Sequence, residues 1–461
     1  MVFELKEQWL ADLETPVSAF LKLLPLRPVF LLESVEGGEI LGRYSFIGLR
    51  PLLRLEVFAD RTLIVEGESR QWLSENPFLI LKKILHRLNG SPSSDELPRF
   101  SGGLVGYAGY DMVRFIERLP NVTQETMPFP LAAFCLPSVI LAFDHLQRKI
   151  SLIGARRELE GDRLIAQIQQ FLKSSVPSWP AQASSPPRPN RSREQFVEQV
   201  ERAKAYIAAG DIFQVVLSIR FEGETEAHPF QVYRALRTIN PSPYMYYLDF
   251  GPYQIVGSSP ESLVRLENGR AMLRPIAGTR PRGANAEADR QLEAELLADE
   301  KERAEHIMLV DLARNDLGRV AQPGTVSVPN FLTVERYSHV MHLVSSVEGQ
   351  MPPGMDMIDL FEATFPAGTV TGAPKIRAME IIEELEGERR GPYAGSVGYF
   401  GLNGNMDQAI TLRTILFARE RYYIQAGAGI VADSIPEREH QEILNKARAL
   451  FRALEMVAEG L

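Results

Sequence analysis

The sequence predicts a mixed α+β fold in which antiparallel strands predominate. Short segments rich in β-branched and aromatic residues, among them YMYYLDF, YQIVGSS and SLVRL, are interspersed with longer segments of helical periodicity. Asn268-Gly269 and Asn403-Gly404 each lie between two strand-like segments, where an Asn-Gly pair favours a tight hairpin turn. Strands and helices do not alternate regularly, so a parallel β-α-β arrangement is not expected.

The segment VPSWPAQASSPPRPN divides the chain into two regions. It is rich in Pro, Ala and Ser and lacks hydrophobic periodicity, which is typical of a linker or a long surface loop. Ser192 and Gln195 then have the spacing of a helix capping box, and Gly210 offers a helix end. We therefore predict an N-terminal region at residues 1–185 and a C-terminal region at residues 186–461.

The C-terminal region contains two segments with the periodicity of long helices. They run from about residue 286 to 313 and from about residue 436 to 456.

Composition and charge exclude several classes of protein. The chain has 461 residues, of which 45% are hydrophobic and 24% charged, as in soluble globular proteins. Its net charge of −9 argues against binding to a nucleic-acid backbone. The longest nearly apolar run, residues 131–143, is too short to span a membrane. A single cysteine, Cys135, excludes an internal disulfide and, with no signal-peptide core at the N-terminus, favours the cytoplasm.

Paired glutamates lie on both predicted long helices. Glu302 and Glu305 are three residues apart on the first, as are Glu439 and Glu442 on the second, with Lys446 one turn further on. Carboxylates from two helices can converge on a hard cation such as Mg²⁺, which takes oxygen ligands. Solvated charged faces explain the same spacing, so the residues alone leave both interpretations open.

Two small-residue segments and one arginine indicate a site for an anion. In GTVTGAP and QAGAGIV, main-chain N–H groups can approach an anion closely, although tight turns and close packing also require small residues. Arg413 lies in the strand-like ITLRTILF, where a buried guanidinium needs an anionic partner unless it points to solvent. Together these features suggest a metal-assisted site for a small carboxylate.

Six long motifs in this region resemble the chorismate-utilising enzyme family, and in particular its anthranilate synthase branch. They run in the family's order from about residue 195 to the end of the chain: RPIAGTRPRG, DEKERAEHIMLVDLARNDLGRV, ERYSHVMHLVSSVEG, FPAGTVTGAPKIRAMEII, GPYAGSVGYFG and AGAGIVADSIPEREHQEILNKA. The N-terminal LLES, GRYSFIG and GGLVGYAGYD extend the resemblance over nearly the whole chain.

The resemblance implies two facing, mainly antiparallel β-sheets flanked by helices, with the active site in the cleft between them. It implies Mg²⁺ held by Glu305 and Glu442, with Glu302 and Glu439 close by and Lys446 near the metal-bound carboxylate. The positions that match chorismate-binding residues are Gly278, Thr279, Tyr393, Arg413, Gly427, Ala428 and Gly429.

The implied reaction converts chorismate and ammonia to anthranilate and pyruvate. Glu261 matches the family's general acid, and His342 matches a histidine linked to pyruvate elimination. Gln214 stands where water-adding relatives carry a lysine base. Ala277 stands where many aminodeoxychorismate synthases carry a nucleophilic lysine. Component I of an aminodeoxychorismate synthase is the alternative enzyme, and a tryptophan-binding regulator without catalysis is the alternative from another class.

The resemblance also implies partners and regulation. A glutamine amidotransferase subunit, component II of these enzymes, is expected to supply ammonia within a hetero-oligomer. Ser34, Pro243, Tyr244 and Met245 match a pocket for tryptophan as feedback inhibitor. A core strand preceded by a proline turn would also explain residues 243–245.

Overall fold

A computed structural model describes residues 2–34, 42–88, 97–158, 163–337 and 340–461. Its α-helices are α1 (Pro16–Lys22), α3 (Pro77–Leu88), α4 (Arg163–Leu172), α5 (Arg193–Ala208), α6 (Pro229–Ile239), α7 (Ala286–Ala298), α8 (Glu300–Gly318), α9 (Met357–Thr364), α10 (Lys375–Glu386) and α11 (Pro436–Glu459). Short 3₁₀ turns are η1 (Leu24–Leu26), η2 (Tyr110–Phe115), η3 (Arg156–Glu158) and η4 (Gly368–Val370).

The strands before the predicted linker are β1 (Phe3–Leu10), β2 (Pro28–Glu33), β3 (Tyr44–Val57), β4 (Thr62–Glu66), β5 (Ser69–Leu73), β6 (Gly103–Ala108), β7 (Ala132–Asp144) and β8 (Lys149–Ala155). Those that follow are β9 (Arg188–Pro189), β10 (Gln214–Glu224), β11 (Tyr244–Asp249), β12 (Tyr253–Ser259), β13 (Ser262–Glu267), β14 (Arg270–Leu273), β15 (Ile276–Pro281), β16 (Ser327–Arg336), β17 (Val340–Gln350), β18 (Gly372–Ala373), β19 (Ser396–Gly401), β20 (Met406–Ile410), β21 (Thr414–Ala418) and β22 (Arg421–Ile430).

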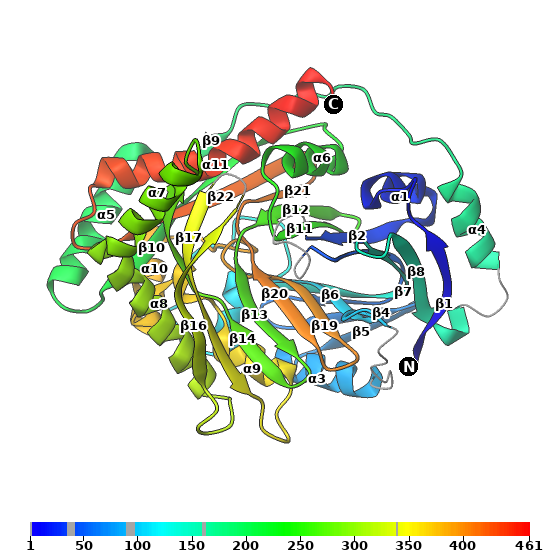
Figure 1. Cartoon of the computed structure of the whole chain (residues 1–461), viewed down its shortest axis with the longest axis horizontal. Helices are drawn as coiled ribbons and strands as arrows, with labels where there is room; N and C mark the ends of the chain where they lie inside the picture. Colours follow the sequence, from blue (N-terminus) through cyan, green and yellow to red (C-terminus); the bar gives the residue numbers. More distant parts are fainter. Residues whose placement is uncertain (1, 35–41, 89–96, 159–162, 338–339) are drawn as a thin grey trace.

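The long antiparallel pair β3 and β7 joins two sheets (Figure 1). The first half of β3 pairs with β2, and the sheet continues through β11, β12, β21 and β22 to β10. The first half of β7 pairs with β6, and the other sheet continues through β19, β20, β13 and β14 to β17. These pairings are antiparallel, so the predicted α+β class with two facing, mainly antiparallel sheets is confirmed.

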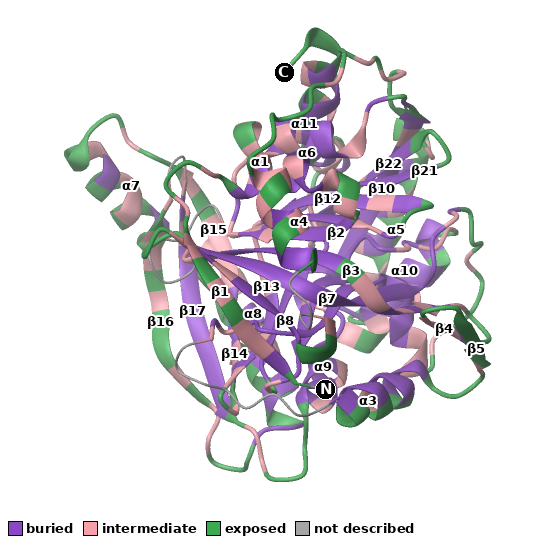
Figure 2. Cartoon of the chain, turned by 90° about the vertical axis from the view of Figure 1, so that its right-hand side faces the viewer, coloured by how far each residue is buried: buried purple, intermediate pink, exposed green. Residues whose placement is uncertain are grey.

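Alternation along the strands divides the core into two layers. On β11, Tyr246 and Leu248 pack into the space between the sheets, whereas Met245 and Tyr247 pack on the opposite face, which α1, α5, α6, α10 and α11 cover. In Figure 2 β17 is almost wholly buried, whereas β16 at its edge alternates between intermediate and exposed residues.

Strands from before and after residue 185 share both sheets. β2 pairs with β11, and β6 pairs with β19. The predicted boundary falls in the segment between α4 and α5, and the division into two regions stays a prediction. Within the described residues, no helix is long and apolar enough to cross a membrane.

Local signals in the sequence place several elements correctly. Ser192 and Gln195 form the predicted capping box at the start of α5. Asn268 and Gly269 both adopt positive φ in the turn between β13 and β14. The prediction of one helix from 286 to 313 is wrong, because the chain breaks at Asp299. The Asp299 side chain accepts from two N–H groups and caps a new helix, α8.

A buried ion pair between Arg390 and Glu386 lies against β10. Arg390, 1% exposed, forms two hydrogen bonds to Glu386 at 2.8 and 2.7 Å and donates to the carbonyl oxygens of Val216 and Val370. Burial alone would raise the pKa of Glu386, but Arg390 holds it below its usual value. The pair ties α10 to β10.

Candidate active site

A bulge in β15 places Gly278 and Thr279 against His342. The register between β15 and β17 shifts between Ala277 and Thr279, and Gly278 adopts a φ of +64°. Nδ1 of His342 lies 3.1 Å from the Gly278 carbonyl oxygen and 3.1 Å from Oγ1 of Thr279. Because a carbonyl oxygen can only accept, Nδ1 carries the proton and Nε2 is the basic nitrogen.

Arg413 approaches the same histidine from the connection between β20 and β21. It has a φ of 45°, and its Nη1 lies 3.4 Å from Oδ1 of Asn240. Burial lowers the pKa of His342 and the charge of Arg413 lowers it further, whereas the Gly278 carbonyl raises it. A neutral imidazole beside a guanidinium suits the binding and deprotonation of an anionic ligand.

The small residues of β22 leave room for two side chains. A Cβ added at Gly427 would stand 2.6 Å from the Tyr393 hydroxyl, and one at Gly429 would stand 2.7 Å from Nε2 of Gln214. Ala428 between them is buried and pairs with Leu217 of β10. The strand therefore needs glycine at both positions because Tyr393 and Gln214 lie directly over it.

Lys446 connects this strand to the glutamates of α11. Its Nζ donates to the Gly427 carbonyl oxygen at 3.0 Å and lies 2.7 Å from Oε1 of Glu442. Oε2 of Glu302, on α8, would stand 3.3 Å from a Cβ at Gly278, so α8 borders the site on its other side.

The four predicted metal ligands influence one another electrostatically. Burial raises the pKa of Glu305, the charges of Glu302 and Glu442 raise it further, and a hydrogen bond from Gln214 opposes them. Burial also raises the pKa of Glu439, with a further contribution from Glu442. As the side chains lie, no three His, Cys, Asp or Glu groups in the described ranges are close enough to enclose a metal ion. Oxygen-only donors that repel one another nevertheless fit a hard divalent cation chemically.

Glu261 lies between β12 and β13 at the edge of the site. Burial raises the pKa of Glu261 to about 7, against smaller lowering effects of Thr369 and Lys446. With Thr369 it lines a cavity of about 40 Å³. A carboxylic acid that remains protonated near neutral pH can act as a proton donor.

The structure thus brings Gly278, Thr279 and Arg413 to His342, and Tyr393, Gln214 and Lys446 to β22. The role of the four glutamates as metal ligands stays a prediction. The four residues predicted for regulation, Ser34, Pro243, Tyr244 and Met245, line a second cavity, which lies between β2 and β11 of one sheet and β19 and β20 of the other. Asp407, which accepts from the Tyr244 hydroxyl at 3.0 Å, lines the same cavity.

The sequence analysis did not identify some residues near the active site and the cavity of Ser34. Arg99 lines the cavity of Ser34, and its Nε is buried without a hydrogen-bond partner in the described chain. Glu335 and Tyr337 lie next to His342. Their two-residue spacing within the ERYSHVMH motif was a signal that both side chains share one face of a strand.

Comparisons with known proteins identify the family of the chain. Residues 27–452 match the family described as chorismate binding enzyme. The chain is 49% identical to anthranilate synthase component 1 from Acetivibrio thermocellus, over 97% of this chain and 94% of that protein. It is 50% identical to anthranilate synthase component 1 from Thermus thermophilus, over 99% of this chain and 98% of that protein.

Solved structures give the same relationship. The crystal structure of anthranilate synthase component I from Streptococcus pneumoniae superposes with a TM-score of 0.81 at 38% identity, covering 97% of this chain and 100% of that one. The menaquinone-specific isochorismate synthase of Escherichia coli, 21% identical, shares the fold with a TM-score of 0.73, covering 98% of this chain and 95% of that one. With its match to the family and these full-length similarities, the chain belongs to the chorismate binding enzymes and, among them, to the anthranilate synthase component 1 proteins.

Proposed function

We propose that this chain is a Mg²⁺-dependent lyase that converts chorismate and ammonia to anthranilate and pyruvate, the first step from chorismate toward tryptophan. The observation that carries the proposal is the arrangement of four side chains: Arg413 acts on His342, and Lys446, which acts on Glu261, donates to the Gly427 carbonyl oxygen of β22. The names of full-length relatives support the same reaction.

Chorismate is a dianion, and the site contains cationic and neutral donors for its carboxylates. Arg413 offers a planar fork for one carboxylate. The Tyr393 hydroxyl beside Gly427 offers a neutral donor, because burial raises the pKa of Tyr393 above its usual value. The small residues at positions 427–429 carry no bulky side chain of their own, so a carboxylate bound there meets the main chain together with Tyr393 and Gln214.

In the first step, ammonia attacks ring carbon 2 and the hydroxyl at carbon 4 leaves as water. The leaving oxygen needs a proton, which Glu261 supplies in its protonated form. Gln214 carries no basic group that would activate water as a competing nucleophile. The product of this step is aminodeoxyisochorismate.

In the second step, the proton on carbon 2 is removed and enolpyruvate leaves from carbon 3, so that the ring becomes aromatic. The released enolpyruvate takes up a proton and becomes pyruvate. Nε2 of His342 is the acceptor of the carbon 2 proton, since the Gly278 carbonyl oxygen holds the proton on Nδ1. Ala277 precedes Gly278 in the same strand and cannot form a covalent bond to the ring, which separates this chemistry from lysine-dependent amination at carbon 4.

Mg²⁺, bound by Glu305 and Glu442 with Glu302 and Glu439 nearby, would offset the repulsion between these carboxylates and the dianionic substrate. Lys446 contributes positive charge at the same place through Glu442 and the Gly427 carbonyl oxygen.

A separate glutamine amidotransferase, component II, supplies ammonia in a hetero-oligomer with this chain. The designation component 1 of the relatives supports a second component. Cys135 is buried in β7, and burial raises the pKa of its thiol to about 12, so it does not suit the glutaminase reaction itself. Its free thiol fits a cytoplasmic location.

Tryptophan inhibits the enzyme by binding in the cavity of Ser34, Pro243, Tyr244 and Met245. Glu33 and Met245 of one sheet and Asp407 of the other line this cavity, so a bound inhibitor contacts both sheets. An inhibitor that binds one arrangement of the walls and not the other shifts the population toward that arrangement.

Product analysis tests the proposed reaction. Purified chain is incubated with chorismate, MgCl₂ and an ammonium salt, and products are followed by anthranilate fluorescence and mass spectrometry. Anthranilate with equimolar pyruvate supports the proposal. Aminodeoxychorismate would overturn it in favour of amination at carbon 4, and absence of turnover with component II present would favour a regulatory protein.

A further inference from the structure

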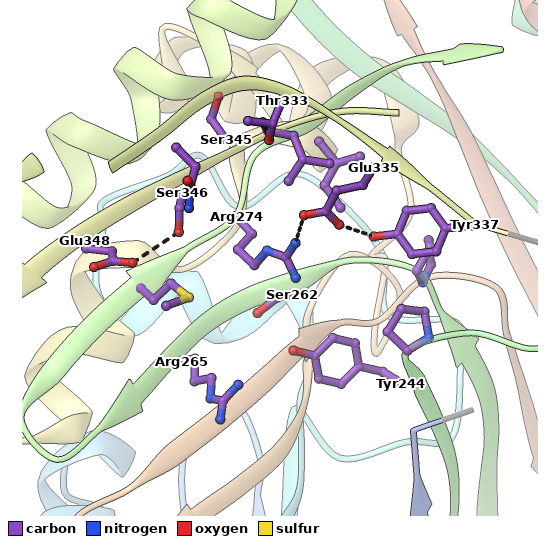
Figure 3. A pocket seen from close by; sticks show the side chains of 16 residues that line it. Tyr244, Ser262, Arg265, Arg274, Thr333, Glu335, Tyr337, Ser345, Ser346 and Glu348 are labelled. Carbon is purple, nitrogen blue, oxygen red and sulfur yellow. Dashed lines mark hydrogen bonds and ion pairs between the residues drawn. The ribbon is translucent and has the colours of Figure 1, made fainter. Parts of the chain in front are cut away.

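A cavity of about 570 Å³ lies beside His342, and three connected side chains form part of its wall (Figure 3). Arg274 follows β14, Glu335 belongs to β16, and Tyr337 comes directly after β16. In Figure 3 the Arg274 guanidinium and the Tyr337 hydroxyl approach the Glu335 carboxylate from opposite sides. Neither the sequence motifs nor the proposed reaction assigns a role to these three residues.

Both carboxylate oxygens of Glu335 are engaged. Oε1 forms an ion pair with Nη2 of Arg274, and Oε2 accepts a hydrogen bond from the Tyr337 hydroxyl at 2.9 Å. The Arg274 side chain is 24% exposed and that of Glu335 is 37% exposed. A single ion pair that is this exposed contributes little to stability. The two interactions of the Glu335 carboxylate nevertheless fix its orientation and that of the Tyr337 ring.

The tyrosine ring contacts the imidazole of His342. Their centroids are 5.7 Å apart at an interplanar angle of 60°, an edge-on arrangement. The N–H of Tyr337 donates to the carbonyl oxygen of Val340, the first residue of β17, at 2.8 Å. Glu335 is also the cross-strand partner of His342. The imidazole is thus held at Nδ1 by β15 and at its ring edge by Tyr337.

Charged groups reach His342 from two other elements besides its own strand. Arg413, from the connection before β21, lowers the pKa of His342, and Glu335, from β16, raises it. Burial lowers this pKa most of all. The position of the Glu335 carboxylate, which Arg274 and Tyr337 determine, therefore affects how readily Nε2 accepts a proton.

We propose that Arg274, Glu335 and Tyr337 are positioning residues that hold the His342 imidazole in the orientation and protonation state needed for pyruvate elimination. The elimination part rests on the proposed function, whereas the positioning part concerns the free protein. None of the three needs to touch the substrate. Their effect on turnover passes through His342, in the way that an outer carboxylate orients a catalytic histidine.

The first test is an NMR titration of the full chain with ¹³C-labelled histidine, in which His342 is assigned by the resonance that His342→Ala removes. Glu335→Gln removes the charge and keeps the shape, and Tyr337→Phe removes the bond to Glu335 and keeps the ring. We expect the pKa of His342 to fall in Glu335→Gln and its ring resonances to shift in Tyr337→Phe.

Glu348→Gln is the matched control. Glu348 lines the same cavity, belongs to the same strand as His342 and is ion-paired with Arg270, but lies six residues further along β17. It should leave the His342 titration unchanged. A purely structural role would alter unfolding in all variants and leave the titration of His342 the same, and this outcome would overturn the proposal.

The second test is steady-state turnover with chorismate, MgCl₂ and ammonium. We expect kcat for anthranilate to fall about tenfold in Glu335→Gln with KM for chorismate nearly unchanged, and aminodeoxyisochorismate to accumulate. Arg274→Lys should retain more activity than Arg274→Ala, since it keeps the positive charge. A rise in KM alone, without the intermediate, would show that these residues bind substrate and would overturn the proposal.

The two tests separate this proposal from the proposed function. If the unaltered chain makes no anthranilate, the proposed function fails, and the NMR titration still decides whether the three residues position His342. If the unaltered chain makes anthranilate and His342→Ala accumulates the intermediate, but Glu335→Gln changes neither titration nor kcat, the reaction stands and the positioning role fails.

Discussion

The carbonyl oxygen of Gly278 lies 3.1 Å from Nδ1 of His342, and the bulge that creates this contact requires glycine. Gly278 has a φ of +64°, and an added Cβ would stand 2.9 Å from Leu296. We expect Gly278→Ala to displace the carbonyl and reduce kcat/KM for anthranilate formation by about tenfold or more. Gly354→Ala is the control, because Gly354 has a φ of +90° with open space around it. Steady-state fluorescence assays of both variants measure the effect, and equal activity of the two would contradict it.

His342→Ala should slow elimination more than amination, because the variant loses the acceptor for the proton on carbon 2. Mass spectrometry of quenched reactions should then detect aminodeoxyisochorismate while anthranilate formation falls at least a hundredfold. A fall in turnover with no aminated intermediate would remove His342 from the elimination step.

Glu261 should make stability depend on pH. Its folded pKa of about 7 lies above the ordinary value of 4.5, so its contribution to stability is complete below pH 4.5 and is lost as pH rises through about 7. Glu261→Gln cannot ionise and should gain about 3 kcal/mol relative to the unaltered chain between pH 4.5 and 8. Denaturant unfolding of both proteins at several pH values measures this gain. Parallel pH profiles would mean that Glu261 ionises normally.

Removal of a carboxylate from either long helix should abolish the response to magnesium. We expect Glu305→Gln and Glu442→Gln each to reduce Mg²⁺-dependent turnover at least a hundredfold while the circular dichroism spectrum is retained. Glu437→Gln, an exposed position in the first turn of α11, is the control and should remain active. Ordinary activity of Glu305→Gln at millimolar Mg²⁺ would contradict the metal assignment.

Ser34→Ala should weaken tryptophan inhibition without changing kcat. Ser34 lines the proposed inhibitor cavity and lies outside the candidate active site. Loss of one hydrogen bond to a charged ligand group should raise the inhibition constant about tenfold. Calorimetric titration with tryptophan measures the affinity, and Ser69→Ala on exposed β5 serves as control. Unchanged inhibition would exclude the Ser34 hydroxyl as a contact of tryptophan.

The buried pair of Glu386, at the end of α10, and Arg390, just beyond it, should contribute far more to stability than a surface pair within α10. Glu386→Ala leaves the Arg390 charge buried without its carboxylate and should reduce the free energy of unfolding by about 3–5 kcal/mol. Arg377 and Glu380, both about one-third exposed, form the comparison pair. Glu380→Ala should change stability by less than about 1 kcal/mol in the same denaturant experiment. Equal losses in the two variants would contradict the role of burial.

The sequence predicted those features that depend on neighbouring residues. The capping box of Ser192 and Gln195 and the Asn268-Gly269 turn need nothing beyond a few adjacent positions. The break at Asp299 was missed because the Asp299 carboxylate accepts from backbone N–H groups and so starts a new helix. The hydrophobic periodicity on either side contains no information about this hydrogen bonding.

The site could be predicted from long motifs, but its supporting contacts could not. Glu335 meets Arg274 across strands whose register no local pattern determines. Arg390 and Glu386 have the four-residue spacing of an ordinary surface pair, and their burial depends on how α10 packs against β10. Such contacts follow from tertiary packing.

The pairing of β6 with β19 imposes a waiting time during synthesis. Asn403, just beyond β19, donates to the Arg99 carbonyl oxygen 304 residues earlier in the chain. A ribosome adding about 5–20 residues per second needs roughly 15–60 s to deliver that partner. Until then one edge of β6 has no strand beside it, and a chain that ends before residue 396 never provides β19. Premature termination should therefore yield aggregates rather than a smaller folded protein, so that solubility depends on the last seventh of the coding sequence.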